Sequence, residues 1–216
     1  MKTCFNRILW TCLLPAALLL AGSSRAQNPI RYEAQPGAGK VRIDGTSTLH
    51  DWAVESRAVG GFMELDAAFD ADLKTLTSQP KVEVNVPVRQ LKNTEGKKSM
   101  DNVMYEHMHL KDYQAIKYRL LDLTAKPGGA GASQFDARGE LTISGVTRTN
   151  TMAITMERID KTKIKVNGAT SLKMTDFGIK PPAPSILGLA PIKTGDDVNL
   201  TFDWTVAQPE KPSGGQ

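Results

Sequence analysis

The sequence contains only two cysteines, Cys4 and Cys12, and neither lies beyond residue 26. The remaining 190 residues therefore have no disulfide, cysteine nucleophile or cysteine metal ligand. Net charge is also scarce: residues 1–26 hold three basic residues and no acidic one, which leaves 24 basic and 23 acidic residues in the rest of the chain. Such a balance provides no basic surface that would displace counterions from nucleic acid. Nucleic acid is therefore not an expected partner.

The chain also lacks an apolar run long enough to cross a membrane as a helix. Its longest run, residues 8–21, has 14 residues, whereas a membrane-spanning helix needs about 18 or more. Lys2 and Arg7 precede this run, and Ser24-Arg25-Ala26 follows it with small residues at the positions that signal peptidases prefer. We therefore expect residues 1–26 to be a signal peptide, with cleavage near Ala26 and a periplasmic or secreted mature protein.

Most of the mature chain alternates apolar and polar residues, which is the pattern of half-buried β-strands. The clearest run is 198–206, where Val, Leu, Phe, Trp and Val alternate with Asn, Thr, Asp and Thr. Similar runs are 82–89, 116–120, 134–143 and 164–174, and turn residues rich in glycine separate them. About eight to ten strands with one apolar face each predict an all-β fold, either an antiparallel barrel or a sandwich.

One segment, residues 99–110, has helical periodicity instead. At about 100° per residue its apolar side chains fall on one face, with Ser99 as the expected N-cap and Asp101 on the opposite, polar face. The apolar face consists of Met100, Val103, Met104, His107, Met108 and Leu110. We expect this short amphipathic helix to cover a barrel mouth. Its methionines are typical of irregular cores and also of cavities that accept long apolar ligands.

The segments outside the strands give the expected domain limits. We expect a loose N-terminal lead-in over residues 27–40, the β-domain over 41–207 and a flexible tail over 208–216. Residues 176–196 form a long connection that has four prolines and several apolar residues. Long connections of this kind are usually functional or disordered, and an apolar one favours a packed lid.

The candidate binding residues combine the helix, this lid and one strand. From the lid we expect Phe177, Ile179 and Leu187 to contact an apolar ligand, together with the apolar face of the helix. Trp204 is added as a large apolar residue of the last strand, although alternation alone does not show which strand face points inward.

His50 and Asp51 support a different function, with Ser47 nearby. A small hydrolase or isomerase that uses His50 and Asp51 is one alternative, although residues so close in sequence rarely assemble a triad. An all-β interaction module with a filled core is another. His107 and His109 would lie about 160° apart on a helix, so they are not expected to share a metal ion.

Four stretches of the sequence, in the same order, resemble the YceI-like family. They are residues 41–52, residues 98–101 with His109-Leu110, residues 139–148, and residues 172–179 with Gly195-Asp196. The resemblance extends over about residues 41–207 and is most specific at Gly139–Arg148. It implies an eight-stranded, lipocalin-like antiparallel barrel with the helix and loops at its mouth, which holds an isoprenoid chain in its interior. The leading hypothesis is therefore a non-enzymatic exported carrier of an isoprenoid lipid or quinone, without metal or other cofactor and of open oligomeric state.

Overall fold

The computed structural model describes residues 28–127, 132–184 and 191–210. Within these residues the chain forms eleven strands, two α-helices and two short 3-10 helices. In chain order they are β1 Ile30–Ala34, β2 Lys40–Ser47, β3 Trp52–Ser56, β4 Gly60–Leu65, α1 Ala67–Asp72, β5 Lys81–Pro87, η1 Val88–Gln90, β6 Lys92–Asn93, α2 Lys98–His107, β7 Ala115–Ala125, β8 Ser133–Ile143, β9 Val146–Asp160, β10 Lys163–Lys173, η2 Thr175–Phe177 and β11 Thr194–Ala207.

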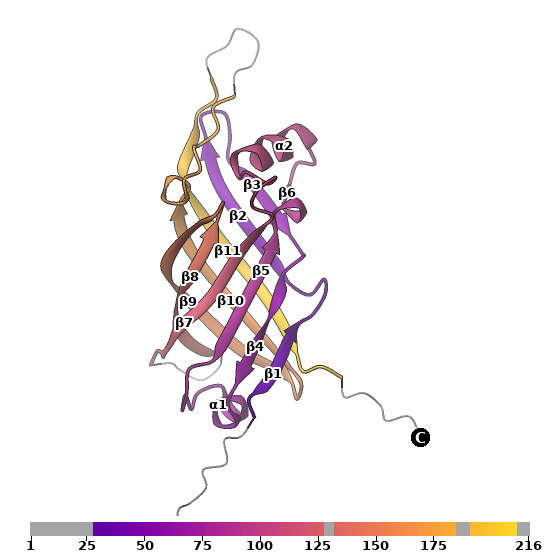
Figure 1. Ribbon diagram of the computed structural model, residues 1–216, viewed down its shortest axis with the longest axis vertical. Coiled ribbons are helices and arrows are strands. Elements are labelled where there is room, and N and C mark those ends of the chain that lie inside the picture. Colours follow the sequence, from indigo (N-terminus) through magenta and orange to yellow (C-terminus); the bar gives the residue numbers. More distant parts are fainter. Residues whose placement is uncertain (1–27, 128–131, 185–190, 211–216) are drawn as a thin grey trace, which may run out of the picture.

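Eight of the strands form a closed antiparallel barrel (Figure 1). Around the ring the order is β1-β4-β5-β7-β8-β9-β10-β11, and the ring closes where Ala34 of β1 pairs with Val206 of β11. β2, β3 and β6 continue the sheet from β11, because residues 198–203 of β11 pair with β2 rather than with β1. The prediction of an all-β, lipocalin-like barrel of about eight strands is confirmed.

The alternation in the sequence places apolar side chains in the barrel interior. In β8 every second residue from Phe135 to Ile143 is buried, and β11 buries Val198, Leu200, Trp204 and Val206 in the same way. The residues that alternate with them are exposed or half-buried and point outward, while Phe202, on the inward face of β11, is half-buried. Because each inward side chain removes apolar surface from water, this pattern is the main source of stability of the barrel.

α1 covers the end of the barrel opposite to α2 (Figure 1). Phe69 of α1 is fully buried, and its ring meets the ring of Phe135 edge-to-face with 5.6 Å between the centroids. The Tyr32 hydroxyl donates a hydrogen bond of 2.6 Å to the Asp70 carboxylate, and the Arg158 guanidinium lies 2.9 Å from the same carboxylate. These contacts join α1 to β1 and β9 and hold it against the barrel.

The structure differs from the expected domain limits at both ends. Part of the expected lead-in is β1, which pairs with β4 and β11 and carries the fully buried Tyr32. Gln208, in the expected tail, donates a hydrogen bond of 3.0 Å from Nε2 to the Tyr32 hydroxyl. The sequence did not indicate β1, because a five-residue strand is too short to show a clear alternation of apolar and polar residues. It did not indicate the contact of Gln208 either, because its partner lies at the other end of the chain.

α1 itself was not expected from the sequence. Its six residues are too few to show a helical period. The local reason for the helix is the Asp66 N-cap, whose carboxylate accepts a hydrogen bond from the Phe69 N–H at 2.9 Å. Leu73 then ends the helix in the left-handed conformation, with φ of 53°.

Replacing Phe69 with alanine should lower the free energy of unfolding by about 3–5 kcal/mol, because it leaves a cavity between α1 and the barrel. Urea unfolding followed by circular dichroism measures this change. Leu49→Ala is the matched control: its side chain is 63% exposed, so its effect should stay within about 0.5 kcal/mol. Equal effects of the two substitutions would show that α1 does not stabilise the barrel.

Candidate functional site

The larger interior cavity, here called the outer cavity, lies at the end of the barrel where α2 is found. It has a volume of about 450 Å³. Side chains of α2, of the segment after β10 and of the strand ends line it, and most of them are apolar. They include Ile43, Leu49, Trp52, Val54, Met100, Val103, Met104, His107, Met108, Ile143, Leu172, Met174, Phe177, Ile179, Pro182, Pro184, Ile192 and Val198.

A second cavity, the deep cavity, lies further inside the barrel and has a volume of about 120 Å³. Its walls are strand residues and are almost wholly apolar, including Met63, Val82, Val84, Tyr118, Leu141, Met152, Met156, Val166 and Trp204. Ile116 and Leu200 line both cavities, so the two spaces adjoin there. The barrel interior is therefore not completely filled, which argues against the module with a filled core.

A buried polar cluster attaches α2 to β6. Asp101 is buried, and its Oδ1 accepts hydrogen bonds from the Asn93 backbone N–H at 2.7 Å and from the Asn93 side-chain amide at 2.6 Å. Oδ1 of Asn93 accepts a hydrogen bond from the backbone N–H of Lys97 at 3.0 Å. These bonds satisfy polar groups that would otherwise be unpaired at the start of the helix.

This cluster corrects two expectations about α2. The N-cap is Lys97 rather than Ser99, and it has no side-chain cap of its own. Asp101 was expected on the exposed face, yet it is only 7% exposed. Both differences have one cause: Asn93, which precedes the helix on β6, supplies the capping groups and the partner for Asp101.

The electrostatic environment keeps Asp101 ionised. Burial raises the pKa of its carboxyl group, but the two hydrogen bonds from Asn93 and the nearby Lys92 ammonium lower it more. The net effect is a pKa below the usual aspartate value. Nζ of Lys92 lies 3.6 Å from Oδ2 of Asp101, so the carboxylate has both a charge partner and hydrogen-bond donors.

Most candidate residues that the structure describes lie at one of the two cavities. Seven line the outer cavity: Met100, Val103, Met104, His107, Met108, Phe177 and Ile179. Trp204 lines the deep cavity instead, and Leu187 lies outside the described residues. That these residues contact a ligand stays a prediction.

Leu110 does not belong to the lining of either cavity. The expected helix extended to this residue, but α2 ends at His107. His109 adopts the left-handed conformation, with φ of 52°, so Leu110 leaves the apolar face of the helix. It is half-buried and packs against the core instead.

His50, Asp51 and Ser47 do not form the relay that a hydrolase requires. Nδ1 of His50 lies 2.7 Å from the backbone oxygen of Asp51. The Ser47 hydroxyl donates to the backbone oxygen of His50 at 2.6 Å. These polar side chains therefore bond to the main chain and close the β2–β3 turn. In the described ranges, no three His, Cys, Asp or Glu side chains are grouped so that they could hold a metal ion.

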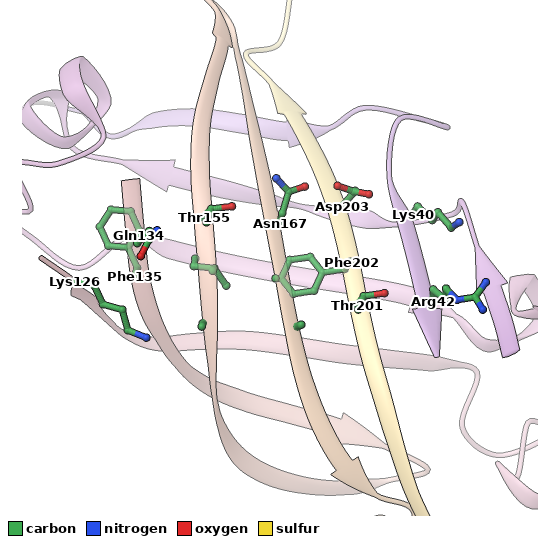
Figure 2. A pocket seen from close by; sticks show the side chains of 14 residues that line it. Lys40, Arg42, Lys126, Gln134, Phe135, Thr155, Asn167, Thr201, Phe202 and Asp203 are labelled. Atoms are coloured by element: carbon green, nitrogen blue, oxygen red, sulfur yellow. The ribbon is translucent and has the colours of Figure 1, made fainter. Parts of the chain in front are cut away.

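A third hollow, the wall groove, lies on the outside of the barrel and was not expected from the sequence (Figure 2). It has a volume of about 620 Å³. Strand register aligns five of its polar residues across β8, β9, β10, β11 and β2: Gln134, Thr155, Asn167, Asp203 and Lys40. Its three cationic groups pair with carboxylates of the same chain, Lys40 with Glu55, Arg42 with Asp44 and Lys126 with Asp136. The cationic groups of the wall groove are therefore neutralised within the chain, and its polar side chains lie beside apolar ones such as Ile154 and Phe202.

The sequence model of the YceI-like domain matches residues 32–206 of this chain. The chain belongs to the YceI-like family. The resemblance in the motifs is thereby confirmed, and the match begins within β1 and ends within β11. No curated protein matches this YceI-like chain at a significant level.

Several solved structures have the same fold at low sequence identity. BcnA of Burkholderia cenocepacia has a TM-score of 0.61 and 14% identity, over 80% of this chain and 98% of BcnA. A polyisoprenoid-binding domain from Saccharophagus degradans, implicated in plant cell wall breakdown, has a TM-score of 0.61 and 12% identity, over 83% and 99%. The YceI protein of Campylobacter jejuni has a TM-score of 0.52 and 16% identity, over 73% and 85%. In the described part of this YceI-like chain, neither helix has the length and apolar character needed to span a membrane.

Replacing Asp101 with alanine should lower the free energy of unfolding by about 1–3 kcal/mol, because the buried donors of Asn93 lose their acceptor. Urea unfolding measures the loss, and amide hydrogen exchange should show it first in α2. The control is Asn102→Ala, a change at the next residue, which is exposed. Equal protection of α2 in the two variants would contradict this anchoring role.

The same cluster predicts an acid effect with a defined sign. Because the folded pKa of Asp101 is lowered, its stabilisation is present above the usual carboxyl pKa and is lost as the pH falls through the folded value. Amide exchange of α2, corrected for intrinsic rates, should therefore accelerate below about pH 4. Asp101→Asn should remove this local step, and an unchanged step would assign it to other carboxyl groups.

Proposed function

We propose that this YceI-like protein is a non-catalytic carrier that holds an isoprenoid lipid or quinone inside the barrel. The observation that carries the proposal is the pair of adjoining apolar cavities, which meet at Ile116 and Leu200. A long chain that extends from the outer cavity into the deep cavity would bury its apolar surface at about 25 cal/mol per Å². Few polar contacts are needed for such binding.

The methionines of the walls support a chain-like ligand. Met100, Met104 and Met108 line the outer cavity, and Met152 and Met156 line the deep cavity. Methionine is unbranched and polarisable, so it adapts to branched or variable apolar surfaces. An isoprenoid chain, with a methyl branch on every unit, presents such a surface.

The relatives support the same ligand class. The similar domain of Saccharophagus degradans is described as polyisoprenoid-binding, and its fold is shared over most of both chains.

We also propose that the protein works after export, since residues 1–26 have the features of a signal peptide. Mass spectrometry of the intact protein from the periplasm or medium should then give the mass of a chain that begins near Gln27, and an uncleaved chain would contradict the proposed export.

The direct test is to identify what the purified protein contains. The mature protein is extracted with organic solvent, and the extract is analysed by mass spectrometry; a prenyl or quinone species in a stoichiometric amount is expected. Trp52 lines the outer cavity and Trp204 the deep cavity, so tryptophan fluorescence should also respond when prenyl lipids are added. An empty extract together with an unchanged fluorescence spectrum would refute the carrier.

Met104→Glu should abolish loading, because it places a carboxylate in an apolar cavity wall where ionisation is costly. The far-ultraviolet circular dichroism of the β-barrel should be retained, since α2 lies outside the ring of strands. Met104→Leu, which keeps the volume and polarity of the wall, is the matched control and should load normally. If Met104→Glu still binds a stoichiometric lipid, α2 does not line the binding site.

A further inference from the structure

His107 brings a polar ring to the apolar face of α2. The residue is half-buried, and it lines the outer cavity together with Val103 and Met104. Nδ1 of the ring lies 2.9 Å from the backbone oxygen of Val103. A carbonyl oxygen can only accept a hydrogen bond, so Nδ1 carries a proton. In the neutral ring, Nε2 then has the lone pair and can only accept.

The accepting nitrogen of His107, Nε2, is open to a partner. The bond to Val103 is the only hydrogen bond that the His107 side chain forms within residues 28–127, 132–184 and 191–210. In these ranges three fully buried side-chain atoms lack a partner, and they belong to Tyr118, Asn167 and Trp204. Nε2 of His107 is not one of them, so this nitrogen keeps accessible surface. Because the ring lines the outer cavity, a ligand there can reach it.

Most other polar side chains of the outer cavity have partners within the chain. The amide of Asn93 bonds to Asp101, and the Ser47 hydroxyl donates to the main chain. Nζ of Lys97 lies 2.5 Å from the Glu95 carboxylate. The remaining polar residues of the lining, apart from histidine, are Ser99, Lys173 and Thr194. The first two are exposed, and a threonine hydroxyl both donates and accepts, so none of the three selects a ligand that donates.

His50 is the second histidine of the lining, and it lies at the exposed rim of the cavity. Its Nδ1 is 2.7 Å from the backbone oxygen of Asp51, so its Nε2 can accept in the same way. The side chain of His50 is 41% exposed, however, and a ligand there only replaces water as the partner. His107 is therefore the acceptor that can distinguish between head groups, and His50 provides its control.

The apolar surroundings of His107 make this acceptor selective. Met100, Val103, Met104 and Phe177 line the cavity with it, and polar atoms that leave water there need a partner. A ligand with an O–H satisfies both its own hydroxyl and Nε2. A ligand oxygen that only accepts brings two lone pairs together with no hydrogen between them, which leaves both groups unpaired.

We propose that His107 binds the hydroxyl head group of the carried lipid, so that the protein takes isoprenoid alcohols or hydroquinones in preference to the corresponding ethers and quinones. The hydroxyl donates to Nε2 in the outer cavity, and the hydrocarbon chain extends past Ile116 and Leu200 into the apolar deep cavity. This assignment rests on the proposed carrier function. It adds the polar group of the ligand, the direction in which the ligand lies and the residue that recognises it.

The test compares two probes that differ at the head group. Farnesol has the hydroxyl, and in farnesyl methyl ether a methyl group replaces the hydroxyl hydrogen. Titration calorimetry measures both affinities at about pH 8, where an ordinary imidazole is neutral. The wild-type protein should prefer farnesol, and His107→Phe should reduce the ratio of the two affinities about three- to tenfold, the loss expected for one hydrogen bond. His50→Phe, the same change at the rim, should leave the ratio unchanged.

A second pair of probes distinguishes the two sources of a hydroxyl. A short-chain ubiquinol and its ubiquinone, compared without oxygen, should show the same preference for the hydroxyl form and the same loss in His107→Phe. Of farnesol and the ubiquinol, the one that the wild-type protein binds more tightly identifies the source. Equal affinities within both pairs would contradict recognition of a hydroxyl.

Nitrogen-15 NMR of the imidazole adds a readout that a purely structural role of His107 would not change. The free protein should show a protonated Nδ1 and an unprotonated Nε2. Farnesol should shift the Nε2 resonance toward that of a hydrogen-bonded nitrogen, whereas the ether should leave it in place. A proton on Nε2 at the same pH would overturn the assignment, because the nitrogen would then be a donor.

The outcomes separate this assignment from the carrier function. If neither farnesol nor its ether binds the wild-type protein, the carrier function fails and the assignment fails with it. If both bind and His107→Phe leaves their ratio unchanged, the carrier stands and the role of His107 is overturned. A ratio that falls equally in His50→Phe would place the head group at the rim, which also overturns it. Binding of the ether by His107→Phe shows that this variant keeps a folded, open cavity.

Discussion

β11 has two different partners along one of its edges. Residues 198–203 pair with β2, and Val206 and Ala207 pair with β1, while β10 pairs with residues 197–207 along the other edge. One edge of a strand can form only one hydrogen-bonded ladder at any position, so β1 and β2 diverge where the partner changes. The ring closes with β1 near α1, while β2, β3 and β6 continue the wall toward α2 (Figure 1). Asn93, which holds α2 through Asp101, lies on the last of these strands.

This branching sets the size and position of the binding space. An eight-stranded ring encloses an interior that side chains can just fill or that can hold one small ligand. At the α1 end, large side chains such as Phe69 and Phe135 fill it. At the α2 end, the diverging wall and the helix above it enclose the outer cavity. The wall groove, which mixes polar and apolar side chains, lies on the outer face of β8, β9, β10, β11 and β2, so this part of the sheet has an apolar inner face and a mixed outer face (Figure 2).

The features that the sequence predicted are those set by neighbours along the chain. Alternation is a local property, and it identified β8 and β11 and with them an all-β fold, either a barrel or a sandwich; the family resemblance implied the barrel. Helical periodicity is local too, and it placed Met100, Met104 and Met108 on one face. The motifs of the YceI-like family supplied the ligand class, which alternation and periodicity do not contain.

The features that the sequence did not predict depend on residues that are distant in the chain or on the fold itself. Asp101 is buried because Asn93 of β6 reaches it, and β1 is ordered because β4 and β11 flank it. The row of polar residues in the wall groove is produced by the register of five strands. Tyr118 and Trp204 line one cavity from opposite walls because β7 and β11 are opposite in the ring, a relation that exists only after closure.

The cover that α1 forms at one end of the barrel has a kinetic consequence. With Phe69 fully buried at that end, the adjoining outer cavity offers a ligand of the proposed carrier a way out of the deep cavity, past Ile116 and Leu200 and then beneath α2. In the proposed carrier, entry and exit share this path, so the residence time of a bound chain depends on how often α2 and its neighbours move as well as on the affinity of the interior. In the proposed carrier, the end of the lipid chain that enters the barrel first is therefore the last to leave it.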